Sequence, residues 1–435
     1  MGKVSIQKSL PLEISLAKSF ESTIFLIMKN YAAIKAICQS NSDLSSQILD
    51  DFLLHYAADK DKLGKEADQR LRTFRHVIQD MDKAWVNLIK SQYIMHRVFK
   101  KGGLIHKYLK HAALAQLPEE GRKWLEEQAA IPWKFSFSRI IERPEADFYT
   151  MEDLFTGEQY LLYSTGISRI LQQGDAVSWF NLIGYNGECW QAFGPISAYR
   201  SFSMDDIFFF ATELNPRIAS DEELMADVSK NPVPYMMLYC RSNYPLTVHE
   251  GVVLELIITE IENLDLSLDK LGEDFEMDRA QSVLQLRLKN WENKPHFAVA
   301  YYDSKEQYLQ VTAMTQIGYA KLVATFQKQG IQVADFADIY VRPSMLTAAR
   351  EILKRPIELL PLELLFEKEA DPQMDEELDK INQFLALAMP DLNAGMEPDL
   401  EDLAAQVGLD LEANRETLQG IFDEIRKMQK NENFR

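Results

Sequence analysis

The chain has 435 residues, enough for about two to four domains of ordinary size. Hydrophobic residues make up 46% of it and charged residues 26%, which is typical of globular proteins and excludes wholesale disorder, collagen-like repeats and coiled-coil arrays. The formal net charge of −19 opposes unspecific attraction to phosphate or to anionic lipid.

The charge is unevenly distributed along the chain. Residues 1–150 carry 23 basic and 18 acidic side chains, whereas residues 151–435 carry 24 basic and 48 acidic ones. Because oppositely charged surfaces attract one another, a polyanionic partner would meet the N-terminal third.

Cysteine usage and the N-terminus indicate the compartment. Cys38, Cys189 and Cys240 lie at long, irregular spacings that offer neither a disulfide framework nor a metal knuckle. Cys240, in the segment YMMLYC, is typical of an inert core thiol. The N-terminus lacks the apolar stretch of a secretory signal, and its longest apolar run, 24–28, is too short to cross a bilayer. We therefore predict a soluble cytoplasmic protein without a membrane attachment.

Residues 1–131 have a helical pattern. Apolar residues recur at spacings of three and four, which predicts a helix over 12–37, a second one capped by Ser42 or Asp43, and a third over 65–100. Gly102 and Gly103 end the third helix; a fourth covers 104–117, and a short one runs through Trp124. Helices with one apolar face each predict an N-terminal helical bundle.

Residues 132–203 read as short alternating strands. About five of them fit between Trp133 and Arg200, with turns at Gly157 and at Asn186-Gly187. Asn-Gly is a strong hairpin signal because a type I′ turn needs positive φ at both residues. This segment predicts a small central β-barrel of SH3-like or OB-like size.

Residues 204–355 mix helices and strands. Ser203 is the expected cap of a helix, and strand patterns cover 251–262, 282–288, 296–302 and 308–314. A helix is expected over 317–328, ended by Gly330. Because the elements do not alternate as regular βαβ units, we predict a two-layer α/β sandwich.

Residues 356–435 form an acidic tail with 20 acidic and 7 basic residues. Periodic apolar positions predict helices over 375–388, 399–407 and 414–430, so the tail is folded or folds on a partner. The predicted fold is thus a multidomain α+β protein: helical bundle (1–131), barrel (132–203), sandwich (204–355) and acidic helical tail (356–435).

A basic strip within residues 70–111 is the first candidate site. Its main cations are Arg97, Lys100, Lys101, Lys107 and Lys110. Clustered cations bind phosphates through charge neutralisation and counterion release, so the strip could bind nucleic acid or an acidic partner. The alternative is a solvated helix face whose cations complement helix C-termini.

Aromatic residues of the barrel are the second candidate. Trp179, Tyr185 and Trp190 could stack on bases, but the segment 146–203 holds only two basic residues, Arg169 and Arg200. Barrel core, together with a protein-contact face, is the preferred interpretation.

The acidic segment LDLSLDKLGEDFEMD is the third candidate. Asp265, Asp269 and Glu276 have the oxygen-ligand spacing of a calcium loop, but Lys270 occupies the position of the turn-forming glycine. A solvated acidic connection is the preferred interpretation.

Phosphate-loop, dinucleotide-binding, nucleophile-elbow and kinase motifs are absent from the sequence. We therefore expect a protein that acts by protein–protein interaction, through the barrel and the acidic tail, without a cofactor. The alternatives are a nucleic-acid-binding protein that uses the N-terminal helices, and an enzyme with an unrecognised carboxylate site in residues 204–355.

Overall fold

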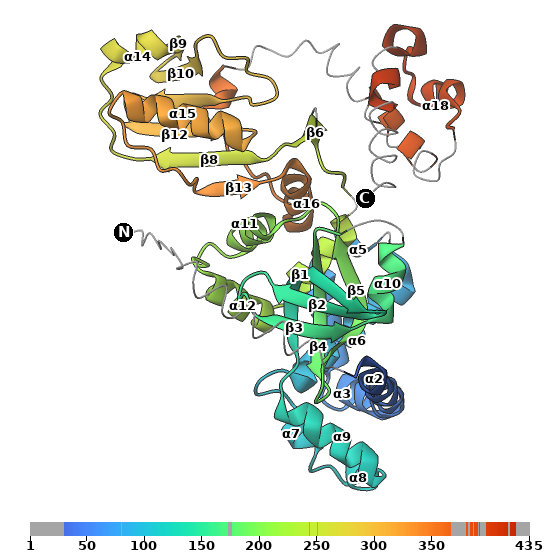
Figure 1. The fold of residues 1–435 in the computed structure, drawn as a ribbon. Coiled ribbons are helices and arrows are strands. Elements are labelled where there is room, and N and C mark those ends of the chain that lie inside the picture. The colour runs from blue at the N-terminus through green and yellow to red at the C-terminus, as the bar shows by residue number, and fades with distance from the viewer. Residues whose placement is uncertain are drawn as a thin grey trace.

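A computed structural model describes residues 30–79, 81–172, 176–242, 244–249, 251–366, 380–381, 383–385, 387–389, 391, 397–415 and 418–422. These residues form a mixed α/β structure with a closed five-stranded barrel, a six-stranded sheet and a two-stranded ribbon (Figure 1). None of the described helices has both the length and the apolar character that crossing a bilayer requires.

The first helices differ from the predicted boundaries. Residues 31–59 are helical without a break, so the cap predicted at Ser42 or Asp43 is wrong. The Ser42 hydroxyl donates instead to the carbonyl of Cys38 within the same helix, at 2.9 Å. This helix comprises α2 (Tyr31–Ser45), the π-helical η1 (Ser46–Leu53) and α3 (Leu54–Asp59).

The prediction of a single helix over 65–100 is also wrong, because this range contains three separate helices. Asp82 caps the last of them, its carboxylate accepting from the Ala84 N–H at 2.7 Å. The end near Gly102 is confirmed, and Gly102 has a φ of 70°. The observed helices are α4 (Leu63–Thr73), α5 (Arg75–Ile78), α6 (Lys83–Phe99), α7 (Ile105–Tyr108), α8 (Ala112–Ala115) and α9 (Glu119–Ala130).

The predicted small barrel is confirmed. Its strands are β1 (Lys134–Glu145), β2 (Phe148–Asp153), β3 (Gln159–Tyr163), β4 (Ser178–Tyr185) and β5 (Trp190–Tyr199), with α10 (Thr165–Leu171) between β3 and β4. The strand order is β1-β2-β3-β5-β4, and the β3–β5 pairing is parallel whereas the others are antiparallel.

The hairpin predicted at Asn186-Gly187 joins β4 to β5, but its turn type was predicted wrongly. Only Gly187 has a positive φ, of 94°. The Asn186 side-chain oxygen accepts from the N–H groups of Glu188 (3.0 Å) and Cys189 (2.9 Å), which shapes a four-residue loop without a left-handed asparagine.

Helices connect the barrel to the sheet. Ser203 caps the first of them as predicted, and Asp206 completes a capping box by accepting from the Ser203 N–H at 2.7 Å. The elements are α11 (Met204–Leu214), α12 (Asp221–Lys230), α13 (Val233–Met237), η2 (Leu238–Arg241) and the ribbon β6 (Val248–His249) with β7 (Val252–Val253).

The six-stranded sheet is antiparallel throughout, in the order β13-β8-β12-β11-β10-β9. Figure 1 shows α15 lying over one face of the sheet. All four predicted strand segments contain a strand, and the predicted helix is present; β9 and β13 were not predicted. The elements are β8 (Leu256–Ile261), α14 (Leu268–Asp274), β9 (Phe275–Ala280), β10 (Val283–Leu288), β11 (Val299–Asp303), β12 (Tyr308–Ala313), α15 (Gln316–Lys328), β13 (Ile339–Val341), α16 (Pro343–Leu353) and η3 (Glu363–Leu365).

Separate hydrophobic clusters hold these parts. The largest cluster joins the N-terminal helices, one side of the barrel, α11, α13 and α16, so the predicted boundaries at 131/132 and 203/204 cut through it. The sheet and α15 share a second cluster. A third lies inside the barrel. The described members of a fourth cluster all come from residues 381–422. We call this range of residues the C-terminal module.

In the C-terminal module, α18 (Leu400–Val407) agrees with the helix predicted over 399–407, and Asp399 caps it. Residues 411–415 and 418–422 are also helical. Much of the helices predicted over 375–388 and 414–430 lies outside the described residues.

Candidate functional site

The predicted basic strip is partly occupied by the protein's own acceptors. The Arg97 guanidinium lies 3.5 Å from the Glu66 carboxylate, and Lys107 pairs with Asp61. Lys100 donates to the backbone carbonyl of Ser229 at 3.1 Å. Three of the five predicted cations therefore already have partners within the chain.

The other two predicted cations, Lys101 and Lys110, have exposed side chains. They follow α6 and α7, where lysines also complement helix C-termini. The nucleic-acid hypothesis stays a prediction that rests on these two residues more than on the rest of the strip.

The predicted aromatic contact face needs one correction. Trp179 is 1% exposed and belongs to the cluster inside the barrel, so its side chain is not available to a partner. Trp190 and Tyr185 are half-buried beside the β4–β5 loop, with ring centroids 5.5 Å apart. The ammonium of Lys134 lies 5.0 Å from the centre of the Trp190 ring.

The predicted acidic loop at residues 265–276 is not a loop. Residues 268–274 form α14, and Glu276 is an exposed residue of the edge strand β9. Asp265 is exposed before the helix, and the side chain of Asp269 lies outside the described part. Among the side chains that the structure describes, no group of three or more His, Cys, Asp or Glu could hold a metal ion.

Among the described side chains of residues 204–355, the most deeply buried carboxylate has a structural role. Asp206 is 0% exposed, and it accepts from the Arg342 N–H at 2.8 Å and from the Ser203 hydroxyl at 2.8 Å. Burial raises the pKa of its carboxyl. Because Asp206 joins α11 to the start of α16 and is closed to solvent, it does not reach a substrate. The hypothesis of an enzyme with a carboxylate site in residues 204–355 stays a prediction, but Asp206 is not a candidate for its catalytic base.

A polar cleft separates the first helix from the barrel. It has a volume of about 210 Å³, and none of its twelve lining residues is ionisable. Its amides are already hydrogen-bonded within the chain: Gln191 accepts from Asn41 at 2.6 Å, and Gln128 accepts from the Trp133 indole at 2.8 Å. Because the amides that line the cleft already have hydrogen-bond partners, we assign the cleft a structural role in joining the helices to the barrel.

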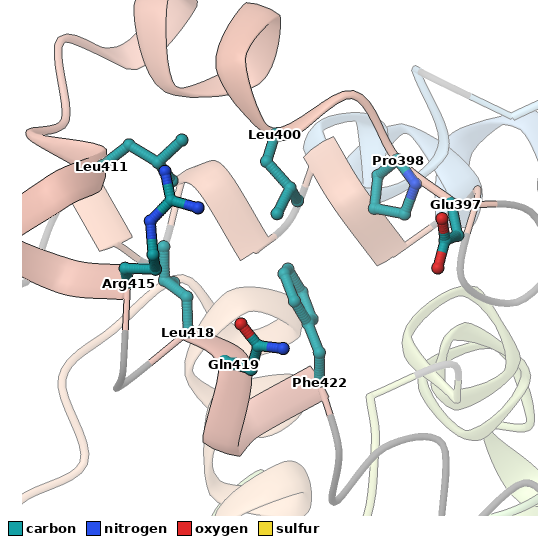
Figure 2. Close-up of a pocket in the computed structure, with 8 residues that line it drawn as sticks. All are labelled: Glu397, Pro398, Leu400, Leu411, Arg415, Leu418, Gln419 and Phe422. Carbon is teal, nitrogen blue, oxygen red and sulfur yellow. The ribbon is translucent and has the colours of Figure 1, made fainter.

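The C-terminal module contains a pocket of about 190 Å³ that is lined by five apolar and three polar or charged residues. Figure 2 shows Leu400 and Phe422 pointing toward one another across it, with Arg415 alongside Leu411. The eight lining residues are Glu397, Pro398, Leu400, Leu411, Arg415, Leu418, Gln419 and Phe422.

Two kinds of residue build this pocket. Leu418 and Phe422 are buried and belong to the core of the module, whereas Leu400 and Leu411 are half-buried and leave apolar surface accessible. At the rim, the Arg415 guanidinium lies 3.6 Å from the Glu412 carboxylate, so its charge is compensated locally. The pocket can accept an apolar side chain, and its surroundings are acidic.

Comparison of the chain with protein-family models, curated proteins and solved structures gives no match. The described residues define a mixed α/β protein with a closed five-stranded barrel, a six-stranded antiparallel sheet and a two-stranded ribbon.

Proposed function

We propose that this protein acts by protein–protein interaction, and that the pocket of the C-terminal module binds a cationic amphipathic helix of a partner. The observation that supports the proposal is the pocket itself, whose walls include three leucines and a phenylalanine and which lies in a module with its own hydrophobic core and a strongly acidic composition. Amphipathic helices commonly dock through apolar side chains into such grooves.

The size of the pocket favours a side chain over a free small molecule. Its volume of about 190 Å³ is smaller than the roughly 300–1,000 Å³ of ordinary small-molecule sites. One large apolar side chain from a helix would cover Leu400 and Leu411, and burying a leucine or phenylalanine contributes about 1.5–3 kcal/mol.

The charge of the module favours a cationic partner. Residues 381–422 contain eight acidic side chains and one basic side chain, Arg415, which is paired with Glu412. Complementary charge speeds encounter and excludes partners of like charge. A helix with leucines on one face and lysines on the other has the matching chemistry.

The test uses a fluorescent helical peptide of leucine and lysine, titrated with the full-length protein and followed by anisotropy. We expect saturable binding that weakens as salt is raised, because exposed charge pairs are screened. A peptide of the same composition in scrambled order, which has no apolar face, should bind much more weakly. Equal binding of the two peptides would show attraction by charge alone and contradict the pocket proposal.

Paired variants locate the binding site. Leu400→Gln places an amide in the pocket wall, and we expect the peptide to bind about tenfold more weakly. Leu387→Gln is the matched control, because Leu387 is 43% exposed in the same module and does not line the pocket. If both variants weaken binding equally, the pocket is not the binding site.

We place this interaction in the cytoplasm. The three cysteines of the described part are free thiols, as proteins of a reducing compartment usually keep them. Cell fractionation with an antibody to the full-length protein tests the location, and recovery in a secreted fraction would contradict it.

A further inference from the structure

The fold brings together two cysteines that are 151 positions apart in the sequence. The Cys38 sulfur, on α2, lies 3.3 Å from the Cys189 sulfur, which directly precedes β5. Both side chains are buried, at 0% and 1% exposure. The spacing of the cysteines in the sequence gave no indication of this proximity, which comes from the packing of α2 on the barrel.

We propose that Cys38 and Cys189 are a modification site: they form a reversible intramolecular disulfide when the protein meets a hydroperoxide such as hydrogen peroxide. Their sulfurs are already in contact, whereas a disulfide needs about 2.05 Å, so closing the bond takes a movement of about 1 Å. The proposal is independent of the pocket in the C-terminal module.

Asn186 holds the pair in place. Its side-chain nitrogen donates to the Cys38 sulfur at 3.3 Å and lies 3.7 Å from the Cys189 sulfur. Its side-chain oxygen accepts from the Cys189 N–H at 2.9 Å, which fixes the loop that carries the second thiol. One residue thus positions both sulfurs.

The surroundings distinguish Cys38 from the third cysteine. The hydrogen bond from the Cys189 thiol lowers the pKa of Cys38, and Asn186 adds to this effect against the opposing effect of burial. The neighbouring Lys35 and Asp147 are paired at 3.1 Å. Cys240 instead donates to the sulfur of Met81, and burial raises its pKa to about 11. Cys38 is therefore the expected nucleophile, and Cys240 is the unreactive control.

The reaction balances in two steps. The Cys38 thiolate attacks one oxygen of hydrogen peroxide, the O–O bond breaks, and a sulfenic acid and hydroxide form. The Cys189 sulfur then attacks the sulfenic sulfur, its proton leaves with the displaced hydroxyl as water, and the S–S bond forms. In total, two thiols lose two electrons and two protons, and one peroxide is reduced to two waters.

The bond would tie α2 to the β4–β5 loop. The two cysteines share a small hydrophobic cluster with Ile34, Phe148, Leu161 and Tyr163, so the cross-link reinforces an existing contact. Because it closes a long loop of the unfolded chain, oxidation should raise the melting temperature, on the order of 5 °C.

The experiment treats the folded full-length protein with hydrogen peroxide, then unfolds it in denaturant, alkylates the remaining thiols with N-ethylmaleimide and maps the peptides by mass spectrometry. We expect a Cys38–Cys189 cross-linked peptide, a loss of about 2 Da and reversal by dithiothreitol, with Cys240 still alkylated. Persistence of both thiols, or oxidation of Cys38 to sulfinic acid without a cross-link, would overturn the proposal.

Three variants sharpen the test. Cys189→Ser should leave a Cys38 sulfenic acid that dimedone traps, and Cys240→Ser should cross-link like the wild type. Asn186→Asp keeps the side-chain oxygen that accepts from the loop but loses the donor to Cys38, so we expect cross-linking about tenfold slower. An unchanged rate in Asn186→Asp would refute its positioning role, and the melting temperature under dithiothreitol confirms that each variant is folded.

Discussion

The barrel and the six-stranded sheet are both small β-structures, but different kinds of side chain join them to their helices. The sheet packs on α15 mainly through apolar side chains, such as Phe326, whose ring stacks on Phe275 at 4.9 Å, beside one buried hydrogen bond between the hydroxyls of Thr259 and Tyr319. The barrel meets its helices through apolar contacts and, in addition, through buried polar groups such as Gln128, His96 and the Cys38–Cys189 pair.

Because of this difference, the two regions should respond differently to pH and to oxidants. Apolar contacts are insensitive to pH and to oxidants, whereas buried polar groups are costly unless they are paired and respond when their protonation changes. We therefore expect the stability of the sheet to depend on volume and shape, and that of the barrel region on protonation and redox state. The following variants test this comparison.

The largest effect is expected in the sheet. Phe326 is 0% exposed, so Phe326→Ala leaves a cavity and should lower the free energy of unfolding by about 4 kcal/mol. Denaturant titrations at pH 8 and pH 5 should show the same loss. Ile317→Ala is the control on the same helix, because Ile317 is 58% exposed and its truncation should cost no more than about 0.5 kcal/mol.

The next effect concerns the buried ion pair where the barrel region meets α16. Asp206→Ala removes the carboxylate that lies 3.7 Å from the Arg342 guanidinium and leaves a mostly buried cation without its partner. We expect a loss of about 3 kcal/mol, measured by urea unfolding. The exposed neighbour Asp205, changed to alanine, is the control and should cost less than about 1 kcal/mol. Similar losses in the two variants would contradict a special role of the buried pair.

The barrel region should also make stability depend on pH. Burial, with Lys100 and Arg97 adding repulsion, lowers the pKa of His96 from 6.5 to about 3. The folded state thus holds this proton less tightly than the unfolded state, so the stability contribution is complete above pH 6.5 and is lost as the pH falls toward 3. At pH 5 this amounts to a loss of about 2 kcal/mol.

Unfolding free energies at pH 8 and pH 5 measure this effect. In His96→Gln the difference between the two pH values should shrink by about 2 kcal/mol, whereas His106→Gln, at an exposed histidine of α7, should leave it unchanged. An unaltered difference in His96→Gln would show that the pH sensitivity originates elsewhere.

The smallest effect is expected at the barrel surface. Lys134 pairs with Glu158 at 2.5 Å and lies over Trp190, so Lys134→Ala should cost about 0.5–1 kcal/mol at low salt and less at high salt. Lys123→Ala, which removes a lysine 3.8 Å from Glu127 on an exposed helix face, should produce no measurable change. A larger loss of stability in Lys123→Ala than in Lys134→Ala would contradict this prediction.

Local signals predicted much of the fold. Alternating residues and Asn186-Gly187 indicated the barrel strands, and Ser203 indicated the start of α11, because these patterns act within a few residues. The edge strand β9, with the sequence FEMDRA, was missed because four of its six side chains are exposed. Its apolar and polar residues therefore do not alternate as they do in a half-buried strand. Asp82 before an apolar run did signal the start of α6, but the longer apolar periodicity concealed it.

The sites were less predictable than the fold. Cys38 and Cys189 meet only through the packing of α2 on the barrel, and no pattern within either segment indicates the other. The pocket of the C-terminal module likewise depends on how separate helical segments pack. The sequence showed the cations of the basic strip but not their partners. Glu66, which pairs with Arg97, lies 31 positions away, and Asp61, which pairs with Lys107, lies 46 positions away.

The central claim is that the C-terminal module recognises a partner helix, and the most direct measurement compares the full chain with a chain that ends at Phe366. The shorter chain keeps every residue of the clusters that hold the barrel and the sheet, so its melting temperature should match that of the full chain. Calorimetric titration with the leucine–lysine peptide should give one binding site on the full chain and none on the shortened chain. Equal binding by the two chains would contradict the claim.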